Sequence, residues 1–484
     1  MSLHLIDLII IVVYFVLLIA IGLRIARKDN NSESFLAASR NMNVVQTSAS
    51  AAATDLGGGF SIAMGGLGFT LGISGSWLIA MSGLSIVLVS FLMVPKVKRW
   101  ADRTQGLTTG DLFEARFDRR TGLVAAIAIG LAWFTFVGGQ VIAGAKLLQV
   151  LMSIELAYAV LISGVIVLAY TTLGGLKAVI YTDVFQMVIL LVGIVFIAVP
   201  IGLYQVGGWE GMVAHFSQSP DPEQQRKIQW GAAGWKTILG WFLAVVPVWF
   251  VSIAGIQRIV AARDETTARR GFFFAGVPIE WPLFAIGATL VGMIASMLFP
   301  DLADPEQATI KVILELLPIG LAGVVVAAYV AAVMSTADSC LIGPVAIFTN
   351  DIYRKWLKPQ ASDKDLLAMA RAATLILGVL SIAMAYLIPS VLDLIMYAYT
   401  FGAAGLFFPM LALLFWPRAT ASGAFWSIIA GGAAAVIWSI AGEPKGFSAS
   451  YMSVMVGLPV LVVVSLSTEH SATERLDLFA PSKP

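Results

Sequence analysis

The sequence predicts an all-α polytopic membrane protein, and composition is the first observation behind that prediction. Hydrophobic residues make up 59% of the 484 residues and charged residues only 12%, whereas about a quarter of the residues in soluble domains are charged. Mean hydropathy is +0.88. Apolar stretches of membrane-spanning length recur along the whole chain, and the polar stretches between them are too short for a soluble domain. We therefore treat residues 1–484 as one transmembrane domain.

Hydropathy in a window of about 19 residues predicts about thirteen transmembrane helices. The first span, at 4–25, is too long for a secretory signal peptide and has no small-residue cleavage site after it, so we expect it to remain as a span. The spans are centred near residues 15, 55, 84, 132, 164, 193, 244, 286, 328, 377, 403, 429 and 459.

Two of the spans look interrupted, and their spacing predicts a repeat. Three glycines, 57–59, follow Asp55 in the middle of the second span, where they weaken a helix. Pro247 removes a backbone hydrogen bond in the seventh span. Five spans run from one break to the other, which predicts two five-helix halves of opposite topology with a binding site between them. The predicted repeats cover about 43–205 and about 233–416, and two C-terminal spans follow at about 420–468.

The basic residues predict the orientation in the membrane. If the N-terminus lies outside, most of the 30 Lys and Arg residues, Arg258 among them, fall in cytoplasmic segments, as the positive-inside rule requires. We expect a multi-pass protein of the plasma (inner) membrane, embedded in the lipid bilayer, with the N-terminus outside and the C-terminus cytoplasmic. The net charge of +1 and the lack of a basic stripe predict no nucleic-acid partner. The single cysteine, Cys340, excludes an intrachain disulfide.

The most informative stretch is a long apolar helix that three hydroxyls and a carboxylate interrupt. Ala332, Ser335, Thr336 and Ser339 fall at positions i, i+3, i+4 and i+7 and therefore share one helical face. An ionisable residue such as Asp338 is costly at this depth and by default indicates a functional site. Hydroxyls that bond to carbonyls of their own helix are the alternative, and that reading explains a lone hydroxyl better than this cluster.

Together with the broken second span, this face predicts a sodium site. The glycines after Asp55 free backbone carbonyls, and sodium, a hard ion, prefers oxygen ligands. Five such oxygens would form a shell without net charge, and Asp55 would tune its affinity or bind a cationic group of the solute. The predicted ligands are the carbonyls of Ala53, Leu56 and Ala332 and the hydroxyls of Ser335 and Thr336.

Three motifs, at 53–58, 174–183 and 334–336, occur in this order on the predicted spans. They resemble the sodium:solute symporter family, the sodium/proline symporters in particular, over roughly residues 5–440, with some likeness to the choline-transporter branch. The resemblance implies a leucine-transporter-like inverted repeat of five plus five helices that carries a solute with Na+ by alternating access. It also implies a conserved sodium site on the same five residues.

The resemblance implies two further features. Some members carry a second sodium site, which would fall here on Asp183, Ser335, Asp338 and Ser339; Asp338 departs from the pattern, because such members have a hydroxyl there. Arg40, at the cytoplasmic entry to the broken span, matches a position that is important in proline symporters, so we expect a gating role for it.

The solute favoured by the resemblance is a small amino acid such as proline. An organic cation drawn to Asp55 is the main alternative, followed by a sugar or a carboxylate; polar residues able to bond several hydroxyls are scarce. We expect the solute pocket between the two broken spans and the helices beside them. Its predicted lining is Thr54, Asp55, Gly58, Trp133, Phe136, Gln140, Val245, Trp249, Ser252, Tyr397 and Phe401.

Two other classes of function are weighed against a symporter. An ion channel would need a polar lining across the whole membrane, whereas the polar residues here cluster at mid-depth. A membrane enzyme or sensor would need a catalytic constellation or an output domain, and the sequence has neither. We therefore predict a symporter rather than an enzyme, functional as a monomer, with a small-molecule solute and sodium as its partners. Glu280, in the eighth span, receives no role from the sequence.

Overall fold

The computed structural model describes residues 4–28, 32–152, 154–469 and 478–479. In these residues the regular secondary structure is helical, apart from one isolated bridge between Met42 and Ala262. The helices up to residue 205 are α1 (Leu5–Lys28), α2 (Ser32–Ala37), η1 (Ala38–Arg40), α3 (Val44–Asp55), α4 (Gly58–Leu71), η2 (Gly72–Ser76), α5 (Trp77–Leu92), α6 (Val94–Thr104), α7 (Thr109–Arg116), α8 (Arg119–Met152), α9 (Leu156–Leu191), η3 (Val192–Ala198) and α10 (Val199–Gln205).

The second part of the chain is built in the same way. Its helices are α11 (Gly208–Ser217), α12 (Pro222–Arg226), α13 (Trp235–Val245), α14 (Val248–Val251), α15 (Ile253–Ala261), α16 (Glu265–Phe274), η4 (Ala275–Phe284), α17 (Ala285–Leu298), η5 (Pro305–Gln307), α18 (Ala308–Leu316), α19 (Leu321–Ala346), η6 (Ile347–Leu357), α20 (Asp363–Leu387), α21 (Val391–Phe415), α22 (Ala421–Ile440), η7 (Pro444–Gly446) and α23 (Ala449–Ser467).

The predicted helical membrane architecture is confirmed. In the described residues, eight helical stretches are long and apolar enough to cross a membrane, or nine if a pair bent by 41° is one span. Shorter apolar helices add Leu5–Leu18, Leu156–Leu168 and Gly405–Phe415. Each predicted span centre falls inside a helix. The count of about thirteen spans and the division into two five-helix repeats stay predictions.

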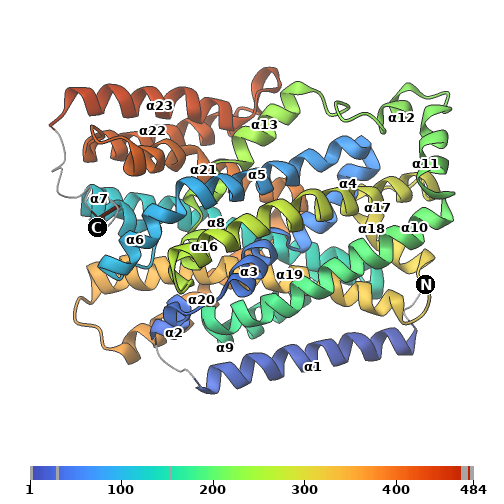
Figure 1. Ribbon diagram of the computed structural model, residues 1–484, viewed down its shortest axis with the longest axis horizontal. Coiled ribbons are helices and arrows are strands. Elements are labelled where there is room, and N and C mark those ends of the chain that lie inside the picture. The colour runs from blue at the N-terminus through green and yellow to red at the C-terminus, as the bar shows by residue number, and fades with distance from the viewer. Residues whose placement is uncertain (1–3, 29–31, 153, 470–477, 480–484) are drawn as a thin grey trace.

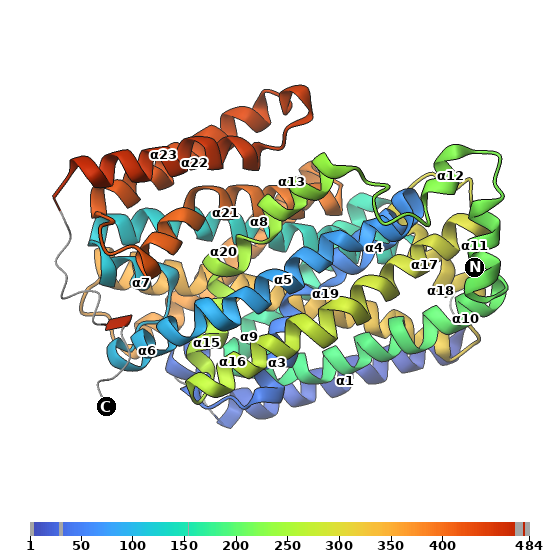
Figure 2. The ribbon, with the colours of Figure 1, turned by 45° about the horizontal axis from the view of Figure 1, so that its top comes forward.

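Helix α19 forms the centre of the bundle and carries the hydroxyl-rich face. Its apolar window is 94% buried, against 33% for α20, α22 and α23, which therefore lie at the periphery. Helices α3, α4, α8 and α9 all pack against α19, and Figures 1 and 2 show it running through the middle of the molecule. The face that the sequence singled out is therefore shielded from lipid on all sides.

The second predicted span is broken where expected. Helix α3 begins with a capping box between Asn43 and Gln46 and ends at Asp55, and α4 starts afresh at Gly58. Between them, Leu56 and Gly57 have non-helical backbone angles, so the carbonyls near the break lose their helical partners.

The break in the seventh span was predicted at the wrong residue. The 41° bend lies between Trp235–Val251 and Ile253–Ala261, at Ser252, whose ψ of 119° is extended. Pro247 only marks the passage from α13 to the short α14. A proline fixes its own φ, but the preceding turn can absorb the missing hydrogen bond, whereas the extended Ser252 cannot continue a helix.

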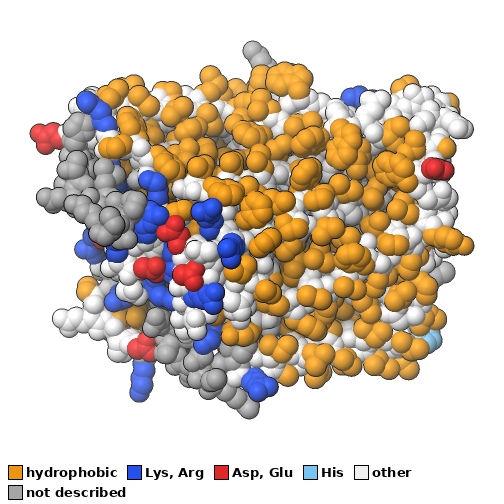
Figure 3. All heavy atoms as spheres, viewed as in Figure 1, with side chains coloured by type: hydrophobic (Ala, Val, Ile, Leu, Met, Phe, Trp, Pro, Cys, Tyr) orange, Lys and Arg blue, Asp and Glu red, His pale blue; other side chains and the backbone are white. Residues whose placement is uncertain are grey.

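The surface divides into an apolar belt and a charged end. Figure 3 shows hydrophobic side chains over most of one face, with Lys, Arg, Asp and Glu gathered at the end where α2, α6 and α7 lie in Figure 1. Helix α1 starts at the opposite end of the bundle, whereas α23 finishes at the charged end. Because the first helix starts at one end of the bundle and the last helix finishes at the other, the chain would cross the membrane an odd number of times.

Candidate functional site

The carbonyl of Ala53, in the last turn of α3, meets the hydroxyl face of α19. Thr336 donates its hydroxyl to this oxygen over 2.8 Å, and Ser335 does so over 3.2 Å. Ser335 also lies 3.2 Å from the carbonyl of Ala332. All four residues are buried. Four of the five predicted sodium ligands therefore come together at one point, from two helices that are far apart in the sequence.

The backbone around the fifth predicted ligand, Leu56, borders the same point. A Cβ placed on the next residue, Gly57, would collide with the side chain of Thr336, and it would lie 2.7 Å from Oε1 of Gln140. Gln140, from α8, accepts a hydrogen bond from the Gly59 amide over 3.0 Å. Only glycine allows α3, α8 and α19 to approach so closely here.

Asp55 belongs to a second polar group on another side of the break. Its carboxylate accepts hydrogen bonds from Ser82 of α5 over 2.5 Å and from the indole of Trp249 over 3.2 Å. The carboxyl group of Glu280 is fully buried beside it, within electrostatic and hydrogen-bonding range of the Asp55 carboxyl group. Glu280, unassigned by the sequence, thus faces Asp55.

A third group surrounds Arg258, which the sequence analysis missed. Its guanidinium lies 3.5 Å from the carboxylate of Asp183 and donates to Ser50 over 3.1 Å and to Ser339 over 2.5 Å. Ser50 in turn donates to Asp183 over 2.5 Å. The prediction that Arg258 lies in a cytoplasmic segment is wrong, because its side chain is buried among α3, α9 and α19. Its place in the apolar run 253–262 was the available signal.

Asp338 completes this third group. One of its oxygens accepts the amide of Ser339 over 2.6 Å, while the other, like Oδ1 of Asp183, is buried and has no hydrogen-bond partner among the residues that the structure describes. Two carboxylates and one guanidinium leave a formal charge of −1 in a dry site. Three members of the predicted second sodium site, Asp183, Asp338 and Ser339, are therefore close together, and the fourth, Ser335, lies one turn away.

The predicted solute-binding aromatics come together in part. Trp133 and Phe136 of α8 line a small cavity with Val248 and Val251 of α14 and with residues of α21. Their ring centroids are 5.6 Å apart. The cavity volume is only about 10 Å³, so the side chains nearly fill this space between the broken seventh span and its neighbours.

Other predicted pocket residues make local contacts. Thr54 donates its hydroxyl back to the carbonyl of Ser50 over 2.7 Å. Ser252 caps α15 by accepting the Gly255 amide over 2.9 Å. Gly58 packs against Val333 of α19. The remaining three predictions fall on Val245, which is buried in α13, on Tyr397, which is exposed, and on Phe401, whose side chain lies outside the described part.

Arg40, for which a gating role is predicted, joins the segment before α3 to the charged end of the bundle. Its guanidinium donates to the carbonyls of Ala101, Gln105 and Gly106 over 3.0 to 3.3 Å, which ties the segment before α3 to the end of α6. Arg40 also lines a cavity of about 280 Å³ together with Asn350 and other residues.

The structure has two interrupted helices, and carbonyls, carboxyl groups and a guanidinium gather around them in the buried centre of the helical bundle. This arrangement is typical of secondary transporters. This arrangement places polar backbone at mid-depth only where protein covers it.

Comparisons with known proteins then identify the family. A model of the sodium:solute symporter family matches residues 35–431. The chain is 26% identical over 462 residues to the high-affinity proline transporter PutP of Bacillus subtilis (strain 168), which covers 90% of this chain and 94% of that protein. It is 28% identical over 469 residues to the sodium/myo-inositol cotransporter 2 of Homo sapiens, which covers 88% of this chain and 68% of that protein.

A solved structure supports the same fold. The protein resembles a Na+-coupled sialic acid symporter in a substrate-bound, outward-open state, with a TM-score of 0.79, 19% identity, and coverage of 97% of this chain and 99% of that chain. The chain belongs to the sodium:solute symporter family. It is a transporter rather than an enzyme, and sodium is its coupling ion.

Proposed function

We propose that this protein imports a small amino acid such as proline together with sodium by alternating access. The observation that carries the proposal is the meeting of the Ala53 carbonyl with the Ser335 and Thr336 hydroxyls at 3.2 and 2.8 Å. These oxygens lie at a helix break that can rearrange when the two halves of a transporter rock.

In this proposal the coupling sodium is held by five oxygens. They are the carbonyls of Ala53, Leu56 and Ala332 and the hydroxyls of Ser335 and Thr336. A neutral shell of oxygens in a buried site suits a monovalent ion. The Asp55 carboxylate lies on another side of the break, and its negative charge can still attract the ion because the distance is short and the dielectric constant of the interior is low.

A second sodium at Asp183, Ser335, Asp338 and Ser339 is a further part of the proposal. The formal charge of −1 around Arg258 supports one additional cation, and the unpartnered oxygens of Asp183 and Asp338 are suitable ligands. Arg258 already supplies one positive charge between these carboxylates, so we expect this site to bind sodium more weakly than the first.

The amino-acid assignment draws on the proline-transporting relatives and on the chemistry beside the break. The paired carboxyl groups of Asp55 and Glu280 suit the amine of an amino acid. The start of α4, with the positive end of its dipole, suits the carboxylate. Trp133, Phe136 and Trp249 would flank the apolar part.

An organic cation is the second candidate solute. One specific observation favours it: two carboxyl groups, those of Asp55 and Glu280, lie side by side in a buried site beside the break. A sugar offers no cationic group to the buried carboxyl groups of Asp55 and Glu280.

The proposal includes the placement in the membrane. The charged end with α2, α6 and α7 faces the cytoplasm, so the N-terminus lies outside and the C-terminus inside. Repeats at about 43–205 and about 233–416 form the moving halves, and the protein acts as a monomer.

The test is solute uptake into proteoliposomes. We would measure entry of labelled proline, other amino acids, choline-like cations, sugars and carboxylates, with an inward sodium gradient and with the gradient collapsed. We expect sodium-driven uptake of an amino acid. Sodium-driven uptake of a sugar alone would overturn the solute assignment, and uptake that depends only on a proton gradient would overturn the sodium site.

A further inference from the structure

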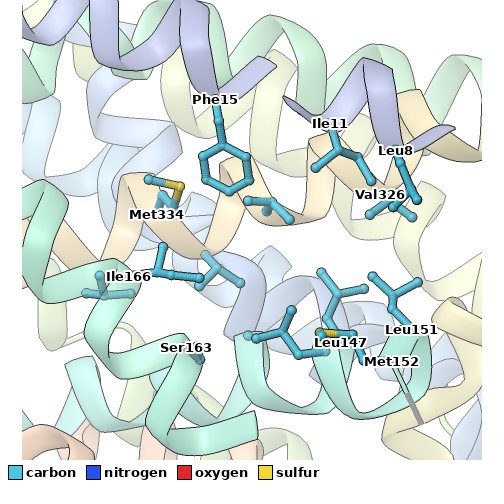
Figure 4. Close-up of a pocket in the computed structure, with 15 residues that line it drawn as sticks. Leu8, Ile11, Phe15, Leu147, Leu151, Met152, Ser163, Ile166, Val326 and Met334 are labelled. Atoms are coloured by element: carbon cyan, nitrogen blue, oxygen red, sulfur yellow. The ribbon is translucent and has the colours of Figure 1, made fainter. Parts of the chain in front are cut away.

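A large apolar cavity lies between α1 and the core of the bundle. Its volume is about 440 Å³, within the range of roughly 300–1,000 Å³ typical of ligand sites. Figure 4 shows Leu8 and Phe15 of α1 on one side of the open space, with Leu147, Leu151 and Met152 of α8 opposite them. Helices α9 and α19 close the remaining sides.

The chemistry of the lining excludes water and a polar solute. Fifteen described residues line the cavity, and Ser163 is the only one with a polar side chain. An ordered water molecule needs two to four polar partners, so water is poorly held here. The charged groups around Asp55 and Asp183 are not part of the lining, so the cavity is distinct from the proposed sodium and solute sites.

The cavity runs inward from the edge of the membrane. Leu8 lies near the start of α1 and Met152 at the end of α8, and both are exposed. Phe15, Ile166 and Met334 form the other end. Leu8 and Phe15 are seven positions apart, which corresponds to roughly 10 Å along the helix. The open end, at Leu8, therefore lies near a membrane surface, and the other end lies near the middle of the bilayer.

Two polar anchors hold α1 away from α8. Asp7 accepts the amides of Gly320 and Gly323 at the start of α19, over 2.7 and 2.8 Å. Tyr14 accepts a hydrogen bond from Gln186 of α9 over 3.2 Å and stacks on Phe185. Because α1 is pinned to α19 and α9 at both ends of the cavity, it cannot slide toward α8 to close the space.

We propose that this cavity binds one acyl chain of a membrane phospholipid, which enters from the leaflet at the start of α1. The outward face of α1 is apolar and exposed from Leu5 to Leu17, so the open end meets hydrocarbon rather than water. A flexible chain fills an elongated apolar space without leaving a polar group unsatisfied. The headgroup stays at the surface beside Leu8.

A single layer of side chains would separate the bound acyl chain from the proposed sodium site. Val333 lines the cavity on one side and packs against Gly58 of the broken span on the other. Met334, which also lines the cavity, directly precedes Ser335. An acyl chain in this position supports α19 from behind.

Photocrosslinking in proteoliposomes tests the proposal. A trace phospholipid with a diazirine in the middle of its acyl chain would be activated by light, and the labelled residues would be identified by mass spectrometry. We expect labels on Leu147 and Val326, which line the cavity and are buried from the outer surface. Labels confined to the outward face of α1, such as Val12 and Val16, would overturn the proposal.

Matched variants on neighbouring residues sharpen this test. Val167→Trp places a large ring in the cavity from a buried position of α9, whereas Val165→Trp adds the same ring to the exposed face of that helix. We expect Val167→Trp to lower labelling of Leu147 by about tenfold, because a packed interior has no room for both groups, while Val165→Trp leaves it unchanged. Equal labelling in both variants would count against the acyl chain.

A second matched pair of variants keeps the test valid if the first variant does not insert into the membrane. Leu8→Trp blocks the open end, and Ile9→Trp is its exposed control. The labelling pattern of the unaltered protein is decisive by itself. None of these readouts requires transport, so they are independent of the proposed coupling and solute.

Discussion

Thr336→Ala removes one oxygen from the proposed sodium site and leaves the rest of it intact. The Thr336 hydroxyl is buried and lies 2.8 Å from the carbonyl of Ala53. A lost hydrogen-bonding or ligating oxygen in a dry site costs about 1–2 kcal/mol, which corresponds to about a 5- to 30-fold change in affinity. We expect the sodium concentration for half-maximal uptake to rise by about tenfold or more, and Ser335→Ala to behave alike.

The assay is the initial rate of solute uptake into proteoliposomes at increasing external sodium. Thr336→Ser restores the oxygen and should keep most of the sodium affinity. Thr374→Ala is the matched control: this threonine is also buried, but its hydroxyl bonds to the carbonyl of Ala370 in its own helix, over 2.8 Å.

An unchanged sodium dependence in Thr336→Ala would refute the five-oxygen site. A rise of the same size in Thr374→Ala would show that loss of any buried hydroxyl weakens the bundle, and would remove the argument for specific ligation.

Four further predictions follow from the other polar groups. Asp183→Asn should lower the Hill coefficient for sodium uptake to about one; a wild type already at that value would argue against a second site. Glu280→Gln should weaken binding of an amine-bearing solute in a competition assay by about tenfold or more, with sodium affinity unchanged. Gly58→Ala brings a Cβ to 3.0 Å from the Val333 backbone and should abolish uptake by inserted protein, whereas Gly432→Ala, with open space around it, should be neutral. Arg40→Met should slow net uptake yet preserve solute binding from outside; equal losses in both would contradict a role in release.

The hydroxyl face of α19 was predictable because its signal is local. Ser335 and Thr336 stand in an apolar helix, where a polar group must find a partner. The glycines after Asp55 likewise mark a helix break, since each weakens a helix wherever it lies. Chemistry of this kind is visible in a few neighbouring residues.

Arg258 and Glu280 show where that reasoning ends. Arg258 looked like one more basic residue near the end of a span, and only the packing of α3, α9 and α19 around it turns it into the partner of Asp183. Glu280 gained meaning only when η4 placed it beside Asp55. The position of the bend in the seventh span was also misjudged, because Ser252 carries no signal as strong as that of Pro247.

The sequence by itself determined that the chain is a helical membrane protein with a broken second span and a cluster of hydroxyls in an apolar helix, because burial in lipid makes each polar residue costly and therefore conspicuous. The tertiary structure alone decided which polar residues meet. Contacts such as that of Thr336 with Ala53 join residues about 280 positions apart and depend on how helices cross. It also decided where a cavity remains. The cavity behind α1 exists because Asp7 and Tyr14 hold that helix away from α8. The sequence cannot predict such a cavity, because apolar residues that pack together and apolar residues that line a cavity form the same sequence pattern.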